Sequence, residues 1–388
     1  MTFLRAITVI ALIWQLFDPH PALSLAVYAL IGLQVVAWVG PRIARRQIEW
    51  RRQTPIVLAP HEMGEVMITI TYQGRFPLPY VVVSEDIPPA LSAVTRLRWV
   101  ISLGRGQSRV FRYTIQGRQR GLYWLGPIHI VVGSVLDQAE VPIISHQQTP
   151  LIITPTIVPL PVLNLPTGLP ASQERRLSLF DDPAQKIGVR PYRSDDSPRQ
   201  IDWKTSARLG SLQVRELAPT IGRETLIVLE FSYTAYRGRF ARDDRERAVI
   251  AAASLAAALI NRRQAVGLRS NGYDPLTAAP LVPLPPAPDR DQLREILSQL
   301  GRIEPAPTGD MLDDLMTADL NLAWGGTLVV ITSAIDDRWL TTLTRLTQSG
   351  LHIAAALADP GPTDLILARS YGIAAYRIDR NGAVVLAM

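Results

Sequence analysis

Cysteine is absent from this sequence of 388 residues, and histidine occurs only five times. The first absence excludes disulfides, thiolate nucleophiles and cysteine metal sites, and it leaves the redox compartment undetermined. The sequence also lacks a P-loop, a nucleophile elbow and a zinc-binding H-E-x-x-H, and no two histidines have catalytic spacing. These absences predict that the protein is not an enzyme.

Long apolar runs without charge are present, and they lie at the N-terminus. Residues 6–17 form one such run, and residues 19–41 form a second one after Asp18. The second run can cross a bilayer, which needs about 20 residues. The first is marginal unless residues 2–5 are included, with Arg5 extended to the interface. We therefore expect a hairpin of two transmembrane helices. A signal peptide followed by one span is the alternative.

The net charge of +6 comes mainly from arginine. Five arginines follow the second apolar run: Arg42, Arg45, Arg46, Arg51 and Arg52. Positive charge this close to a span is typical of the cytoplasmic side, so we expect an inner-membrane protein whose soluble domains face the cytoplasm. A nucleic-acid partner is not expected, because no recognition motif or interleaved aromatic residue accompanies the arginines.

Short alternating segments between residues 56 and 154 predict an all-β domain. Five strands are expected between glycine and proline turns: EVMITITY, LPYVVVSED, RLRWVISL, SRVFRYTIQ and GPIHIVVGS. Such spacing is typical of an antiparallel sandwich or barrel. His61 and His129 lie in this region without metal-ligand spacing, so both are expected to be structural residues.

The densest set of charges lies in residues 188–216. A helix is expected over residues 198–209, with Ser197 as its N-cap, proline at its first position and Gly210 at its end. On that helix Trp203 and Ala207 share one face, which can pack against other residues. Asp202 and Ser206 lie four apart beside it, where they can form hydrogen bonds.

Charges of both signs nearly balance in this stretch, which predicts a local network of ion pairs. The residues concerned are Arg193, Asp195, Asp196, Arg199, Asp202 and Arg208. Two interpretations are open. The stretch is either a structural knot that locks two domains together or a binding or catalytic surface, since networked charges also occur at functional sites.

After Arg223 the hydrophobic pattern changes to buried strands that alternate with helices. Expected strands are TLIVLEFS, AVGLRSN, TLVVITS, LHIAAALA and IAAYRID. Expected helices are residues 243–262 and the segments DRDQLREILSQL, DMLDDLMTADLNLAW, DDRWLTTLTRLTQ and PTDLILARSYG. This alternation predicts a parallel sheet that is covered by helices on both faces.

The charged stretch resembles the signature of a family of bacterial membrane proteins called "domain of unknown function 58", Y-x-x-G-D-x-x-R-x-I-D-W-x-x-S-A-R. The matching residues are Tyr192, Arg193, Asp195, Arg199, Ile201, Asp202, Trp203, Ser206, Ala207 and Arg208. The glycine of this signature is absent from the sequence, which affects the tight turn that it forms in the family. Upstream, RQRGLYWLGPIHI is similar to the family's R-R-G-x-Y-x-L-G-P segment.

The resemblance implies a von Willebrand factor A-like fold for the α/β domain, and folds of that kind hold a divalent cation at the ends of their strands. The positions that match its ligands here are Glu230, Ser232 and Thr234, then Thr308 or Asp310, then Ser333 with Asp336 and Asp337 downstream. Glutamate is longer than the usual aspartate and Ser333 has no charge, so we expect weak Mg²⁺ binding or none. A metal-free adhesion-type surface built from the same loops is the other interpretation, and no other cofactor is expected.

Four regions are therefore expected: a membrane hairpin (residues 1–45), a β-sandwich-like domain (46–158), a connector with the signature (159–222) and a von Willebrand A-like domain (223–388). The expected function is non-enzymatic interaction or assembly at the membrane. The resemblance implies a MoxR-type AAA+ ATPase as partner. The alternatives are a hydrolase that uses carboxylates of the signature stretch and a structural component of the cell envelope.

Overall fold

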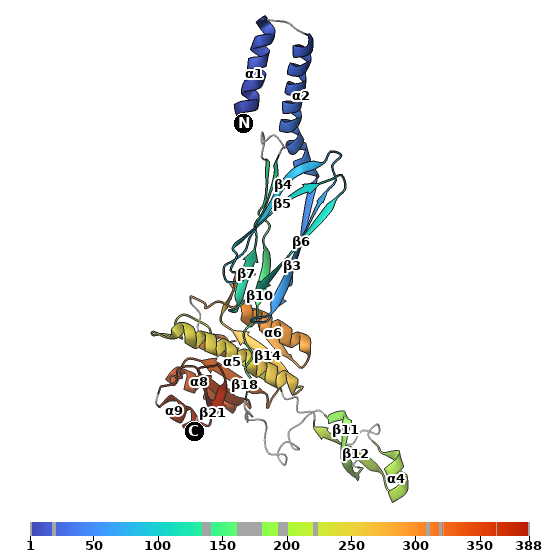
Figure 1. Ribbon diagram of the computed structural model, residues 1–388. Coiled ribbons are helices and arrows are strands. Elements are labelled where there is room, and N and C mark those ends of the chain that lie inside the picture. The colour runs from blue at the N-terminus through green and yellow to red at the C-terminus, as the bar shows by residue number, and fades with distance from the viewer. Residues whose placement is uncertain are drawn as a thin grey trace. The chain divides into compact units, whose positions relative to one another are not determined.

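The computed structural model describes residues 2–17, 21–133, 141–160, 181–192, 201–219, 224–307, 311–317, 320, 322–361 and 363–386. The chain divides into two compact units, Met1–Pro155 and Thr156–Met388. Both are drawn in Figure 1. Thr308, Asp310, Arg193, Asp195, Asp196, Arg199 and Ser197 lie outside the described residues, so the predictions made for them stay predictions.

Two apolar helices begin the first unit, α1 (Thr2–Phe17) and α2 (Pro21–Ala44). They lie side by side, and the amide of Gln34 donates a hydrogen bond to the hydroxyl of Thr8 between them. The segment Ser24–Gln47 is long and apolar enough to cross a membrane, whereas α1 contributes only a shorter apolar helix, Ala6–Gln15. By length and composition the described chain thus holds one clear candidate span, where the sequence predicted two.

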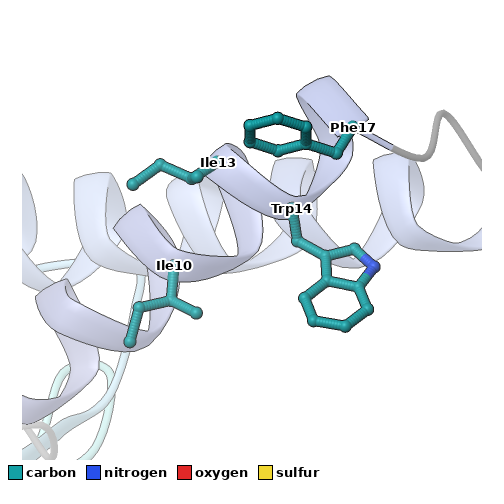
Figure 2. A pocket seen from close by; sticks show the side chains of 4 residues that line it. All are labelled: Ile10, Ile13, Trp14 and Phe17. Atoms are coloured by element: carbon teal, nitrogen blue, oxygen red, sulfur yellow. The ribbon is translucent and has the colours of Figure 1, made fainter.

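Helix α1 nevertheless has a continuous apolar stripe. Figure 2 shows its side chains around a shallow hollow: Ile10, Ile13, Trp14 and Phe17. They are spaced three and four residues apart and therefore lie on one face of the helix. All four are exposed, Phe17 to 85%, so this face of the helix has no apolar partner among the described residues.

Helix α2 continues without a break into a 3-10 turn, η1 (Arg45–Gln47), and a strand, β1 (Ile48–Gln53). Ala44 at the end of α2 is buried in the core of the β-rich part. The five arginines are therefore divided: three lie at the end of the helix, and Arg51 and Arg52 lie within β1. The pattern predicts one group of five arginines beside the membrane, whereas the side chain of Arg52 is buried.

The rest of the first unit is built from β-strands. They are β2 (Val57–Leu58), β3 (Met63–Tyr72), β4 (Leu78–Asp86), β5 (Arg96–Leu103), β6 (Ser108–Gln116), β7 (Gly121–Leu125), β8 (Ile128–Gly133), β9 (Val141–Ser145) and β10 (Thr149–Ile153). Three sheets result, ordered β1-β3-β6, β5-β4-β8-β9 and β2-β10-β7. The five predicted strands are confirmed, while β1, β2, β7, β9 and β10 were not foreseen.

The first sheet packs against both of the others. Strand β3 alternates between exposed and buried residues along its length, as expected of a strand with one face in a core. Its residues Ile68 and Ile70 share a cluster with β4 and β8, and Val66 shares a second cluster with β7 and β10. The packing of facing sheets agrees with the sandwich-like domain that the alternating pattern predicted.

The second unit opens with a two-stranded antiparallel sheet, β11 (Asp181–Pro191) and β12 (Gln213–Pro219), and a short helix between them, α4 (Trp203–Leu209). The signature residues lie in these elements and in the chain that joins them. Helix α4 contacts β12. This part of the chain is the first of the two candidate sites described below.

A mixed sheet of seven strands follows, ordered β17-β14-β13-β18-β19-β20-β21. Its strands are β13 (Glu224–Leu229), β14 (Ala265–Ser270), β17 (Leu284–Ala287), β18 (Thr327–Thr332), β19 (His352–Leu357), β20 (Ala374–Ile378) and β21 (Val384–Leu386), and a small hairpin is formed by β15 (Tyr273–Asp274) and β16 (Ala279–Pro280). The helices are α5 (Ala241–Asn261), α6 (Arg290–Arg302), α7 (Met311–Thr317), α8 (Asp337–Gln348) and α9 (Asp364–Ser370). The five predicted strands are confirmed and are parallel to one another, and β17 and β21 add antiparallel edges.

Helices cover both faces of this sheet. Side chains of α5 and α6 share one core with inward residues of the central strands, such as Ile227, and side chains of α7, α8 and α9 share a second core on the other face, where Val228 lies. Successive strand residues thus point to opposite faces and are buried on both, as in α/β folds. The predicted helix over DMLDDLMTADLNLAW is confirmed only for Met311–Thr317.

Candidate functional site

The signature helix α4 begins later than predicted. Asp202 is its N-cap, because the Asp202 carboxylate accepts a hydrogen bond from the Thr205 amide at 3.1 Å. The helix cannot start at residue 198 as predicted, since Ile201 pairs with Val214 and the Asp202 amide donates to the Gln213 carbonyl at 2.8 Å. This strand-like pairing occupies backbone hydrogen-bonding groups that a helix starting at residue 198 would need for its own hydrogen bonds.

The end of α4 agrees with the prediction. Gly210 has φ of 67° and its amide donates to the carbonyl of Ser206 at 3.0 Å. A positive φ at this position favours glycine, which has no Cβ to clash with the backbone. The sequence therefore located the C-terminal cap of the helix correctly.

The predicted hydrogen-bonding face of α4 is confirmed. The hydroxyl of Ser206 donates to the Asp202 carbonyl at 2.8 Å and accepts the Gln213 amide at 2.8 Å. Both Asp202 and Ser206 are buried, with 6% and 8% of their surface exposed. These bonds attach the helix to β12, so the two residues hold α4 in place.

The side chain of Trp203 is not packed against other residues as the sequence predicted. The side chain is 66% exposed, so the prediction that it packs into the structure is wrong. Because Asp202 and Ser206 face β12, the next residue along the helix is turned outward by about 100°. Leu209 and Leu212, which follow the signature, are also exposed, to 59% and 46%, so this part of the chain presents a large aromatic side chain and two aliphatic ones at its surface.

The remaining described signature residues flank this helix. Tyr192 follows β11, and its amide donates to the Leu212 carbonyl at 2.9 Å. Arg208 is exposed on α4. The predicted ion-pair network depends on residues outside the described part of the chain, and it stays a prediction.

A second candidate site lies at the carboxyl ends of β13 and β18. These two strands are neighbours, and the chain leaves them toward strands on opposite sides of the sheet, which makes their ends a topological switch point. Glu230 follows β13 and Thr332 ends β18. The hydroxyl of Thr332 donates to a carboxylate oxygen of Glu230, so the sheet brings together residues about 100 positions apart in sequence.

The predicted ligands Ser232 and Thr234 are engaged with each other. Their hydroxyl oxygens lie 3.0 Å apart, and the oxygen of Ser232 also accepts the Ala235 amide at 3.2 Å. Ser232 is fully buried. Its oxygen therefore closes a turn after β13, a role that requires no metal.

Ser270 and Asn271, at the end of β14, belong to the same edge and were missed in the sequence. The side chain of Asn271 accepts the Phe231 amide at 2.6 Å, and the hydroxyl of Ser270 donates to the Leu229 carbonyl at 2.6 Å. Both tie β14 to the chain that leaves β13. Two polar residues directly after the buried strand AVGLR were the available signal for them.

The phenol of Tyr236 lies buried near this edge. Burial raises the pKa of Tyr236 well above its ordinary value, and the carboxylates of Glu230 and Asp244 add to the effect. The hydroxyl has no hydrogen-bond partner among the described residues. The phenol is therefore held in its neutral form.

Two positions that the resemblance implies for a cation site, Thr308 and Asp310, lie outside the described residues, so weak or absent Mg²⁺ binding stays a prediction. No group of three or more His, Asp or Glu side chains that could hold a metal occurs among the described residues. Asp336, a possible late ligand, instead caps α8 by accepting the Trp339 amide at 2.9 Å. Mg²⁺ requires near-octahedral oxygen ligands, and at this edge Glu230 and Ser232 already accept hydrogen bonds from the protein.

We expect the full chain, in neutral detergent, to bind Mg²⁺ or Mn²⁺ weakly or not at all. Titration calorimetry should show no stoichiometric binding in the micromolar range, and a Ser232→Ala variant should give the same trace. Thr344→Ala, which removes a hydroxyl from α8 far along the chain, is the matched control. A micromolar site that disappears with Ser232→Ala alone would refute this prediction and restore a metal-dependent surface.

Both candidate sites lie in a part of the chain that matches a known protein family. Residues 188–367 match the family described as "Protein of unknown function DUF58". No curated protein matches the chain. The matched range includes α4 and the strands of the second candidate site, in agreement with the resemblance found in the signature.

Several solved structures resemble parts of the chain. The CARDB domain of a Pyrococcus furiosus protein, in complex with di-metal ions, is 17% identical, with 27% of this chain and 91% of that chain covered and a TM-score of 0.21. The C-terminal domain of wzt is 16% identical over 32% of this chain and 83% of that chain, with a TM-score of 0.22. A β-glucosidase from Listeria innocua in complex with glucose is 13% identical over 27% of this chain and 16% of that one, with a TM-score of 0.18.

Proposed function

The chain belongs to the DUF58 family through residues 188–367, and we propose that it is a non-enzymatic interaction or assembly protein of the inner membrane that works with a MoxR-type AAA+ ATPase. One observation carries the proposal: Trp203, the aromatic residue of the signature, is 66% exposed on a helix that buried bonds hold in place. Exposed tryptophan on a rigid element is typical of the residues that dominate protein interfaces. The identity of the partner class rests on the family resemblance.

The role of Asp202 supports an interaction function over a hydrolase. A hydrolase built on this stretch would need its carboxylates to be accessible to substrate. Asp202 is 6% exposed, and its carboxylate is engaged by the Thr205 amide at the start of α4. The described carboxylate of the signature thus serves the local fold.

The strand order of the α/β part supports a von Willebrand A-like fold. Its central parallel strands have a switch point between β13 and β18, helices cover both faces, and an antiparallel strand closes each edge. Such folds bind partners through the loops at the carboxyl ends of the strands. We include this fold in the proposal, with the hydroxyl-rich edge around Ser232 as a metal-free surface.

Membrane anchoring completes the proposal. The segment Ser24–Gln47 supplies one span by length and composition, and the apolar stripe of α1 supports a second span that completes a hairpin. Arg42, Arg45 and Arg46 lie at the C-terminal end of α2. Positive charge at that end favours the cytoplasmic side for everything that follows.

Binding between purified components tests the proposed function. The tagged full chain in neutral detergent should retain a purified MoxR-type ATPase from the same bacterium, and retention should respond to the nucleotide bound by the ATPase. A tagged membrane protein of unrelated fold serves as the control for non-specific retention. Failure to retain the ATPase in any nucleotide state, together with measurable hydrolysis of an ester or peptide substrate, would overturn the proposal in favour of an enzyme.

The proposed topology gives a separate prediction. A reporter fused after residue 388 is expected in the cytoplasm, because the arginines at the end of α2 favour the cytoplasmic side for that end of the helix. The measurement is protease protection in intact cells and in inverted membrane vesicles. A reporter that is cleaved from outside intact cells would contradict the placement.

A further inference from the structure

An open hollow of ≈ 750 Å³ lies where α2 ends, lined by Arg42, Arg45, Arg46, Val141 and Pro142. The arginines come from the last turn of α2 and from η1, and the two apolar residues begin β9. Among the residues that the structure describes, no acidic side chain lines the hollow. It is therefore a positively charged recess at the place where the chain leaves its apolar helix.

Arg42, Arg45 and Arg46 form no ion pair with any residue that the structure describes. Arg42 lies over the ring of Trp38 at 3.9 Å and donates to the Trp38 carbonyl, which holds its guanidinium at the helix end. Arg52, by contrast, is buried against Glu85 at 2.7 Å, so it does not add to the open charge of the recess.

A second basic and apolar element lies at the same end of the β-rich part. The Gln73 amide donates to the Gln47 carbonyl at 3.0 Å, which ties the turn between β3 and β4 to η1. A Cβ on Gly74 would meet the ends of the Tyr72 and Gln47 side chains, so the two segments pack closely here. The turn presents Phe76, 79% exposed, next to the exposed Arg75.

We propose that the recess formed by Arg42, Arg45 and Arg46 binds the phosphate of an anionic phospholipid headgroup, with Phe76 inserted beside it at the membrane interface. Guanidinium groups match phosphate oxygens with two parallel hydrogen bonds. Basic residues directly after a span attract anionic lipid, and aromatic residues favour the interface. The inference rests on the membrane anchoring proposed above, and it assigns a lipid preference that anchoring alone does not give.

Native mass spectrometry of the full chain in neutral detergent tests the proposal. With equal amounts of phosphatidylglycerol and phosphatidylcholine present, we expect the anionic lipid to be retained in preference. The double variant Arg45→Gln/Arg46→Gln should lower that retention roughly tenfold or more, since each arginine near a membrane surface contributes about a factor of five. Arg109→Gln/Arg118→Gln removes the same charge from exposed positions in and after β6 and should leave retention unchanged.

Three results would overturn the inference. Equal retention of the two lipids would remove the headgroup preference, and unchanged retention by the Arg45→Gln/Arg46→Gln variant would place the lipid elsewhere. Displacement of phosphatidylglycerol by millimolar inorganic phosphate would identify a site for the free anion. Carbonate extraction of membranes tests the anchoring separately. A chain that carbonate releases would overturn both the membrane anchoring and the lipid site. A chain that stays in the membrane but shows no preference for phosphatidylglycerol would overturn only the lipid site.

Discussion

Replacing Glu85 by leucine is expected to lower the free energy of unfolding of the β-rich part by about 3–5 kcal/mol, because it leaves a buried charge without its partner. The side chain of Arg52 is 2% exposed and lies 2.7 Å from the carboxylate of Glu85, which is fully buried. With leucine in place of Glu85, the guanidinium keeps its charge, since arginine does not deprotonate in proteins. The expected loss is a large share of the stability of a typical domain.

This ion pair joins all three sheets of the first unit. Arg52 lies on β1 and Glu85 on β4, and Arg52 also donates to the Leu125 carbonyl at 3.1 Å and to the Thr149 hydroxyl at 2.9 Å, on β7 and β10. Burial raises the pKa of Glu85, and the Arg52 guanidinium acts in the opposite direction. Burial and the neighbouring carboxylate raise the pKa of the Tyr113 phenol, which stays neutral beside Glu85.

Hydrogen exchange of peptides from β4 and β8 in the full chain is the suitable measurement, because it reads the β-rich part separately from the α/β part. Asp86→Asn is the matched control: Asp86 follows Glu85 on β4, but its pair with Arg96 is largely exposed, so a much smaller change is expected. The double variant Arg52→Met/Glu85→Leu removes both charges and should recover most of the stability. If hydrogen-exchange protection in the Glu85→Leu variant equalled that of the unsubstituted protein, the guanidinium of Arg52 would be solvated without its partner, and the prediction would be wrong.

Arg52 also shows why the sequence did not predict every strand of the first unit. A run of arginines after an apolar helix predicts membrane orientation, but the pattern does not distinguish an arginine on a solvated helix end from one that enters a core as half of an ion pair. The strand IEWRRQ was missed for this reason, because its inward residues include Arg52. Strands β9 and β10 were missed because each contains a proline, which weakens a strand prediction.

The α/β part was predicted more completely, because its central strands hold continuous apolar runs that are buried on both faces, such as LVVI in β18 and IAAAL in β19. The short antiparallel edges β17 and β21 have no such runs. In the signature, the helix end at Gly210 was predictable from glycine alone. The start was not, because Ser197 and Asp202 are both good N-caps, and only the pairing of Ile201 with Val214 selects Asp202.

Trp203→Ala is expected to weaken binding of the AAA+ partner about 30-fold or more, which corresponds to the roughly 2 kcal/mol that defines an interface hot spot. The expected change in stability is small, because two-thirds of this side chain is already exposed, and surface substitutions usually change stability by about 0.5 kcal/mol or less. The measurement is a titration of the full chain with purified ATPase, together with hydrogen exchange in α4 and β12.

Two variants distinguish a contact residue from a structural one. Trp324→Ala makes the same substitution at a residue that is 61% exposed outside the signature, and it should leave ATPase binding unchanged. Asp202→Ala removes the helix cap and should destabilise α4 by about 0.5–2 kcal/mol, so it lowers both exchange protection and binding. If Trp203→Ala also lost protection in α4 and β12 in proportion to its loss of binding, Trp203 would hold the helix in place and the exposed signature would not be the recognition surface.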